Sequence, residues 1–175
     1  MSELFSIQLQ NRQQQGRDGV WLDLPTTTEQ VQAALRQIGI SSDNPQNLFI
    51  SGYFAEEEKR FAIPYNMVLA SNVDELNFLA ARLETLSAGE RAELNAALQA
   101  PQSELSSIGR ITDFPENVDY YVHLPDVRGP AQLGDYYLNR SGMVDMPEEW
   151  KGGIDTAQFG RYVAQQEQGA FTQYG

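Results

Sequence analysis

The sequence predicts an α+β fold made of three small consecutive units, and two patterns in the chain lead to this prediction. Apolar and polar residues alternate near the N-terminus, which is typical of half-buried strands. Three later segments begin with a helix-capping pattern and continue with apolar residues at helical spacing. Changes between these patterns place the predicted units at residues 1–66, 67–110 and 111–175.

The first unit contains three of the predicted strands. Alternation over residues 5–10 and again over 20–24 predicts an antiparallel pair, joined by a Gln-rich loop that contains glycine. A third strand is predicted farther along the chain. We expect its Leu48, Ile50 and Phe54 to lie on one face.

Three capping boxes predict the starts of three helices, because a Ser, Thr or Asn side chain there can bind the free N–H groups of the first turn. The boxes are Thr26 with Glu29, Asn72 with Glu75, and Ser87 with Glu90. Gly39 should end the first helix and Pro101 the third. The second helix has one apolar stripe, formed by Val73, Leu76, Leu79, Ala80 and Leu83.

The third unit is predicted to be α/β as well. Alternation over residues 118–124 predicts a strand, residues 130–142 a helix, and residues 143–153 a loop. Asp155 caps a last helix, and residues 170–174 are strand-like. The inward face of the last helix is predicted to hold Phe159, Tyr162 and Val163.

The charge of the chain restricts its partners. Lys and Arg number 12 against 24 Asp and Glu, giving a net charge of −12. Such a balance disfavours direct binding to nucleic acid or to an anionic membrane, since both depend on Lys and Arg. We therefore expect a basic protein partner. The N-terminus lacks a signal-peptide pattern and no apolar run could span a bilayer, so the sequence predicts a cytoplasmic protein.

The residues that usually carry chemistry are scarce. The absence of cysteine excludes disulfides, thiolate zinc sites and cysteine nucleophiles. A Ser or Thr nucleophile would need His123, the single histidine, as its base. His123 falls on the polar side of its predicted strand, where we expect a half-exposed ring hydrogen-bonded to a neighbour. The sequence thus predicts no catalytic residue, cofactor or metal.

One enzyme hypothesis stays open. Pro125-Asp126 followed by Glu149-Trp150-Lys151 has the letters of the P-D…E-x-K nuclease motif, in which carboxylates hold magnesium and a lysine assists the attacking water. In such nucleases the second part lies on a core strand, whereas here it falls in a predicted loop. The net charge of −12 also opposes DNA binding.

The chain resembles the ArdA antirestriction proteins of plasmids, phages and conjugative elements. The N-terminal part of the resemblance is the segment from Gly19 to Pro25, and the central part is Asp74 to Asn77 with Leu83 to Leu86. The C-terminal part consists of Tyr136, Tyr137, Gly142, Pro147, Asp155 and Phe159-Gly160-Arg161. These segments occur in the same order as in the family and extend over nearly the whole chain.

The resemblance implies an elongated protein of three small domains that dimerises through the third and imitates bent B-form DNA. Family members occupy the DNA-binding groove of type I restriction–modification enzymes and so protect incoming DNA. Their antirestriction motif corresponds to about residues 143–155. This chain is less acidic there: Lys151, Gly152 and Gly153 intervene, and residues 156–158 replace a more acidic stretch.

Two sets of candidate site residues follow. The phosphate-mimicking carboxylates are Asp74, Glu84, Asp113, Glu116, Asp119, Asp126, Asp135, Asp145, Glu148, Glu149 and Asp155. The predicted dimer interface comprises the apolar residues of the loop, Met143, Val144, Met146 and Trp150. An acidic adaptor for some other basic protein is the alternative to a DNA mimic, and it would have its acids scattered or gathered in one isolated patch.

Overall fold

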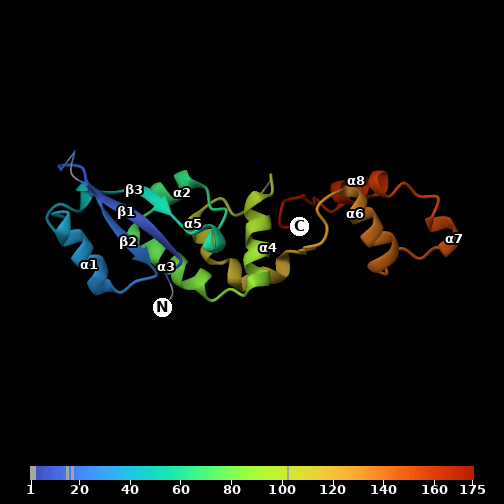
Figure 1. Cartoon of the computed structure of the whole chain (residues 1–175), viewed down its shortest axis with the longest axis horizontal. Coiled ribbons are helices and arrows are strands. Elements are labelled where there is room, and N and C mark those ends of the chain that lie inside the picture. The colour runs from blue at the N-terminus through green and yellow to red at the C-terminus, as the bar shows by residue number, and fades with distance from the viewer. Residues whose placement is uncertain (1–2, 15, 17, 102) are drawn as a thin grey trace. The chain divides into compact units, whose positions relative to one another are not determined.

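The computed structural model describes residues 3–14, 16, 18–101 and 103–175. It confirms the predicted α+β class, with a three-stranded antiparallel sheet and eight α-helices in this described part (Figure 1). The chain forms two compact units. Unit 1 comprises residues 1–91 and 104–118, and unit 2 comprises residues 92–103 and 119–175. The division into three domains stays a prediction.

The sheet of unit 1 has the strand order β2-β1-β3. Its strands are β1 (Phe5–Asn11), β2 (Val20–Leu24) and β3 (Leu48–Phe54), so the three strands predicted in the first unit are confirmed. Both pairings with β1 are antiparallel. The central strand β1 has the most buried side chains, because it has a hydrogen-bonded neighbour on each side.

A bulge in β3 corrects one prediction. Opposite β1, the register passes from Leu9↔Ile50 to Gln8↔Gly52, which leaves Ser51 without a partner position. Since one extra residue shifts the alternation, Tyr53 rather than Phe54 continues the inward face begun by Ile50. Phe54 is accordingly 55% exposed, and its predicted position on the face of Ile50 is wrong.

The helix α1 (Thr28–Gln37) begins one residue later than predicted. Its capping box is formed by Thr27 and Gln30. The backbone of Thr26 is held instead by Asn77, whose Oδ1 accepts from the Thr26 N–H at 2.7 Å and whose Nδ2 donates to the Thr26 carbonyl at 3.0 Å. This tertiary contact leaves Thr27 as the first residue able to cap the helix.

The other two predicted caps are observed, the one at Ser87 as a full capping box. Asn72 caps α3 (Val73–Glu84) by accepting from the N–H of Glu75 at 2.9 Å, and the predicted apolar stripe is buried. At the start of α4 (Ala88–Gln99), Ser87 and Glu90 each accept from the other's backbone N–H. Shorter elements are η1 (Pro45–Asn47), η2 (Glu57–Lys59), α2 (Tyr65–Leu69), α5 (Ile108–Thr112), η3 (Phe114–Glu116) and η4 (Val118–Tyr120).

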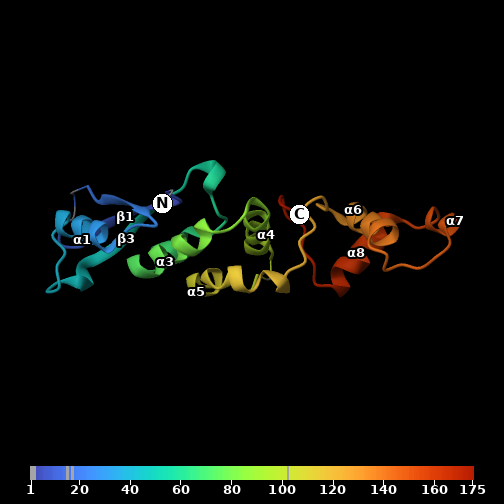
Figure 2. The same ribbon diagram turned by 90° about the horizontal axis from the view of Figure 1, so that it is seen from below.

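Unit 2 is built around two helices that pack side by side, α6 (Pro130–Asp135) and α8 (Thr156–Gln166) (Figure 2). A π-helical turn, η5 (Tyr136–Arg140), continues α6, and Gly142 ends it with a φ of +70°. Asp155 caps α8, as predicted, by accepting from two backbone N–H groups. The buried core consists of Val127, Leu133 and Val163.

The strands predicted in the third unit are wrong. Residues 121–124 and 170–174 form neither helix nor strand, and η4 occupies the start of the first segment. Tyr120 is 85% exposed and Val122 is 89% exposed, so the apolar side chains of this alternating segment are not packed against a hydrophobic core. Tyr162, which we expected to face inward on α8, is also exposed.

Candidate partner-binding surface

Four of the candidate carboxylates lie in unit 1. Asp74 is in the first turn of α3 and Asp113 follows α5; both are exposed and form no ion pair within the described residues. Glu84 ends α3 and is half-buried. Glu116 accepts from Arg82 at 2.7 Å, so its charge is compensated within the unit.

The other seven candidates lie in unit 2, and three of them are already engaged. Asp135 accepts from Asn139 at 2.8 Å and lies 3.7 Å from Arg140, and Asp155 caps α8. Glu148 binds Lys151. The remaining four are exposed and have no ion pair in the part of unit 2 that is described: Asp119, Asp126, Asp145 and Glu149.

Six carboxylates of the predicted set therefore present uncompensated charge to solvent, two in unit 1 and four in unit 2. They are available to the Lys and Arg side chains of a partner. That these acids share one face stays a prediction.

The predicted dimer interface is largely exposed. Met143 is 74% exposed and Trp150 is 67% exposed, while Val144 and Met146 are half-buried. Glu148 and Trp150 lie on a short helix, α7 (Glu148–Lys151), where the sequence predicted a loop. Exposed large apolar side chains on one short segment are typical of a surface that binds another protein.

The residues of the nuclease hypothesis do not form a metal site. Within the described chain, no group of three or more His, Asp or Glu side chains is placed to hold a metal ion. The Nζ of Lys151 lies 2.6 Å from Glu148, to which it donates along α7. Glu149 lies on the same short helix rather than on a core strand. This geometry gives the hypothesis no support.

His123 has a structural contact. Its Nε2 lies 2.8 Å from the carbonyl oxygen of Tyr174, so this nitrogen carries the proton and donates it. The ring is half-buried, as expected, but its partner is 51 residues away rather than a neighbour on a strand. The contact ties the C-terminal segment to residues 121–124.

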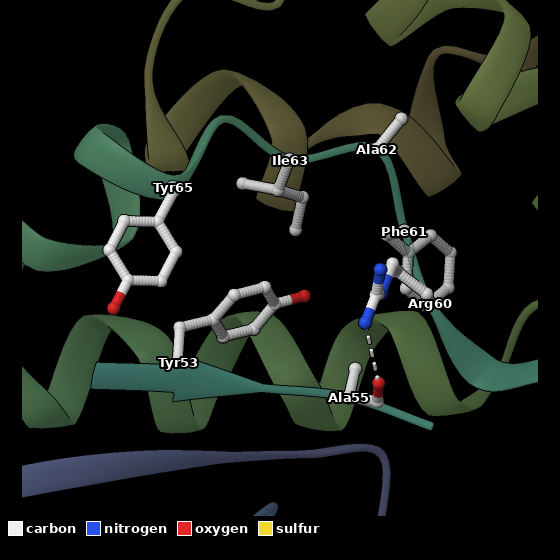
Figure 3. A pocket seen from close by; sticks show the side chains of 7 residues that line it. All are labelled: Tyr53, Ala55, Arg60, Phe61, Ala62, Ile63 and Tyr65. Carbon is white, nitrogen blue, oxygen red and sulfur yellow. Dashed lines mark hydrogen bonds between the residues drawn. The ribbon is translucent and has the colours of Figure 1, made fainter. Parts of the chain in front are cut away.

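Sequence reasoning missed a hollow of about 330 Å³ in unit 1, between the end of β3 and the start of α2 (Figure 3). Tyr53, Arg60, Phe61 and Tyr65 are among the residues that line it. The hydroxyl of Tyr53 is buried and has no hydrogen-bond partner in the described structure. Burial raises the pKa of Tyr53 to about 12, against the opposing effect of the Arg60 guanidinium, so the hydroxyl is neutral at physiological pH.

The fold and the surface together define an acidic α+β protein with six exposed carboxylates that form no ion pair within the described residues. A family model described as antirestriction protein (ArdA) matches residues 15–175. The chain belongs to the ArdA antirestriction family, whose members are non-catalytic inhibitors that act on restriction–modification enzymes. No curated protein matches the chain. In the described part, no helix is both long and apolar enough to cross a membrane.

Proposed function

We propose that this antirestriction protein is a DNA mimic, which occupies the DNA-binding groove of a type I restriction–modification enzyme and so protects incoming mobile DNA in the cytoplasm. The observation that carries the proposal is the set of six exposed carboxylates without an ion pair in the described chain. The side chains that hold DNA phosphates in such a groove are Lys and Arg, and both also bind carboxylates.

The arginines support this proposal, because several are used inside their own unit. Arg12 lies over the ring of Phe49, Arg91 over Phe61, and Arg110 donates to the carbonyl of Glu104. A guanidinium engaged with a ring or carbonyl keeps its charge but forms no direct ion pair with a carboxylate in that contact. More carboxylates are thereby left without an ion pair, at an unchanged net charge of −12, and can meet the cations of a partner.

Total charge alone is too small for mimicry of a long duplex. Duplex DNA carries about one charge per 1.7 Å of axis, so a dimer with twice −12 matches only about 40 Å. The mimic therefore needs its free carboxylates concentrated on the surface that meets the enzyme. We propose the six unpaired acids as the main contributors, and the Met143, Val144, Met146 and Trp150 surface as the dimer interface.

Competition with DNA tests the proposal. Purified protein should displace a DNA duplex from a type I enzyme, and inhibition should weaken with added salt. The salt dependence should be less steep than that of DNA binding, since carboxylates on a protein release no condensed counterions. Inhibitor binding that is equally strong on enzyme saturated with DNA would exclude mimicry and favour the adaptor hypothesis.

Paired variants locate the surface. Neutralising Asp119 and Asp126 together should weaken inhibition, whereas each single change should cost about 0–1 kcal/mol, as exposed ion pairs do. Glu57→Gln with Glu58→Gln is the matched control, because it changes the net charge equally at exposed acids outside the proposed set. Equal loss in both double variants would show that only net charge matters.

A further inference from the structure

The outer face of the sheet in unit 1 holds a row of aromatic side chains. The register places Phe49 opposite Gln10, Trp21 opposite Gln8, and Phe54 opposite Ser6. These positions alternate with the buried Ile7 and Leu9 of β1 and therefore point away from the core. Trp21 is 49% exposed and Phe54 is 55% exposed.

Trp21 is held in a defined position on this face. An ideal Cβ added to Gly52 would lie 3.1 Å from Cη2 of Trp21. Since Trp21 is on β2 and Gly52 on β3, the indole reaches across the central strand β1. The missing side chain of Gly52 leaves room for the ring, and its exposed part remains open to solvent.

One ring of the row already binds a guanidinium. Arg12 lies over Phe49, with its Cζ 5.2 Å from the ring centroid. No Arg or Lys of the described residues lies over Trp21 or Phe54. Indole is the strongest of the aromatic side chains in attracting a cation, so the ring best suited to a cation, Trp21, is among the two left uncovered.

Two carboxylates lie around Ser6, which the register places opposite Asp23 on one side and Phe54 on the other. The hydroxyl of Ser6 is 2.8 Å from Oδ1 of Asp23 and 3.3 Å from Oε1 of Glu3. A hydroxyl has one proton, so it cannot satisfy both carboxylates fully. Neither acid forms an ion pair within the described chain. Two like charges held around one hydroxyl favour an incoming cation.

We propose that the face formed by Trp21, Phe54, Asp23 and Glu3 binds an arginine side chain of a protein partner, with the guanidinium over the indole and its N–H groups on Asp23. The proposed function supplies only the identity of that partner, a restriction–modification enzyme, whereas the binding site is inferred from the sheet face alone. Arginine fits better than lysine because its planar group stacks on a ring and also donates to a carboxylate. A nucleotide is disfavoured as the occupant, because the carboxylates of Asp23 and Glu3 would repel its phosphate.

Fluorescence of Trp21 tests this directly. The chain has two tryptophans, so Trp150→Phe leaves Trp21 as the sole reporter. Titration with a capped octa-arginine peptide at physiological salt should change Trp21 emission saturably. A capped octa-lysine peptide should bind several-fold more weakly. No saturable change, or equal affinity for the two peptides, would overturn the proposal.

Matched variants separate this site from general attraction to an acidic protein. Asp23→Asn and Asp43→Asn change the net charge equally, and both positions are exposed. Asp23→Asn should lower the arginine-peptide affinity about three- to tenfold, and Asp43→Asn should leave it nearly unchanged. Equal effects would overturn the proposal. Emission that shifts with protein concentration before peptide is added would also overturn it, in favour of contact with a second copy.

The contribution of the indole is measured with a fluorescently labelled arginine peptide. Trp21→Ala should weaken its binding about three- to thirtyfold, and Trp21→Phe should restore part of the affinity. Circular dichroism checks that each variant is folded. The assay contains no restriction enzyme, so its failure leaves the proposed function standing. If the unmodified chain binds the peptide but fails to compete with DNA for the enzyme, that result would count against the proposed function alone.

Discussion

Tyr53 shows how a single residue position is decided by packing. Its ring makes edge contacts with Phe5, at a centroid distance of 5.4 Å, and with Tyr65, at 6.4 Å. Its hydroxyl is buried without a partner in the described structure. A buried hydroxyl that lacks a hydrogen bond costs about 1–3 kcal/mol. The ring thus stabilises unit 1 while its oxygen opposes that stabilisation.

We predict that Tyr53→Phe increases the free energy of unfolding by about 1 kcal/mol at pH 7, because the ring contacts stay and the unpaired oxygen is removed. The pKa of Tyr53 is raised to about 12 from 10.0. The stability of the fold is therefore insensitive to this group below pH 10 and falls as the pH rises toward 12, by at most about 3 kcal/mol, because the unfolded chain ionises first. Urea unfolding at pH 7, 10 and 11 checks both statements.

The variant should show a weaker fall in stability over that pH range than the unmodified chain. Other groups also ionise there, so the difference between the two proteins is the quantity to compare. Identical slopes, or a variant destabilised at pH 7, would contradict the prediction.

At the scale of elements, the pairing of α6 with α8 depends on two glycines. A Cβ on Gly134 would collide with the carbonyl oxygen of Thr156, and one on Gly160 would collide with the carbonyl oxygen of Pro130. Both neighbours are backbone atoms, which cannot move aside as a flexible side chain can. The two helices are therefore in contact through their backbones.

Gly134→Ala should separate these helices and destabilise unit 2 by about 3 kcal/mol or more, since overpacking against backbone forces the chain to shift. Gly89→Ala is the control. It lies in the first turn of α4 with nothing near its would-be Cβ, and should be neutral or stabilising by about 0.5–1 kcal/mol. Thermal unfolding monitored by circular dichroism distinguishes the two. A Gly134→Ala protein with an unchanged Tm would refute this view of the contact.

For the whole molecule, the proposed function needs more charge than one chain carries, and dimerisation would double the charge available. The apolar surface of Met143, Val144, Met146 and Trp150 is the proposed contact. An exposed indole and an exposed thioether lose contact with water when a second copy covers them, which favours association.

Val144→Glu or Trp150→Glu should convert the dimer to a monomer, because a carboxylate buried in an apolar contact is strongly disfavoured. Light scattering after gel filtration measures the mass. Val122→Glu serves as the control, since Val122 is 89% exposed and lies outside the proposed contact; this variant should stay dimeric. An unmodified chain that is monomeric at tens of micromolar would contradict the proposed dimer.

The sequence by itself determined the local structure wherever neighbouring residues supply the stabilising contacts. The caps at Asn72, Ser87 and Asp155 are formed within a few residues, and the stripe on α3 follows from helical periodicity. The α+β class and the family resemblance depended on such patterns, and both are confirmed.

Only the tertiary structure decided features that depend on distant segments. Residues 118–124 alternate like a strand but have no strand beside them, among the described residues, to supply hydrogen bonds. The bulge at Ser51 turned Tyr53 inward and Phe54 outward. Sequence named candidate acids, but it could not tell that Arg82 would neutralise Glu116 and leave Asp113 free of ion pairs among the described residues. Charge is a property of composition, whereas its compensation depends on which side chains the fold brings within a few ångströms.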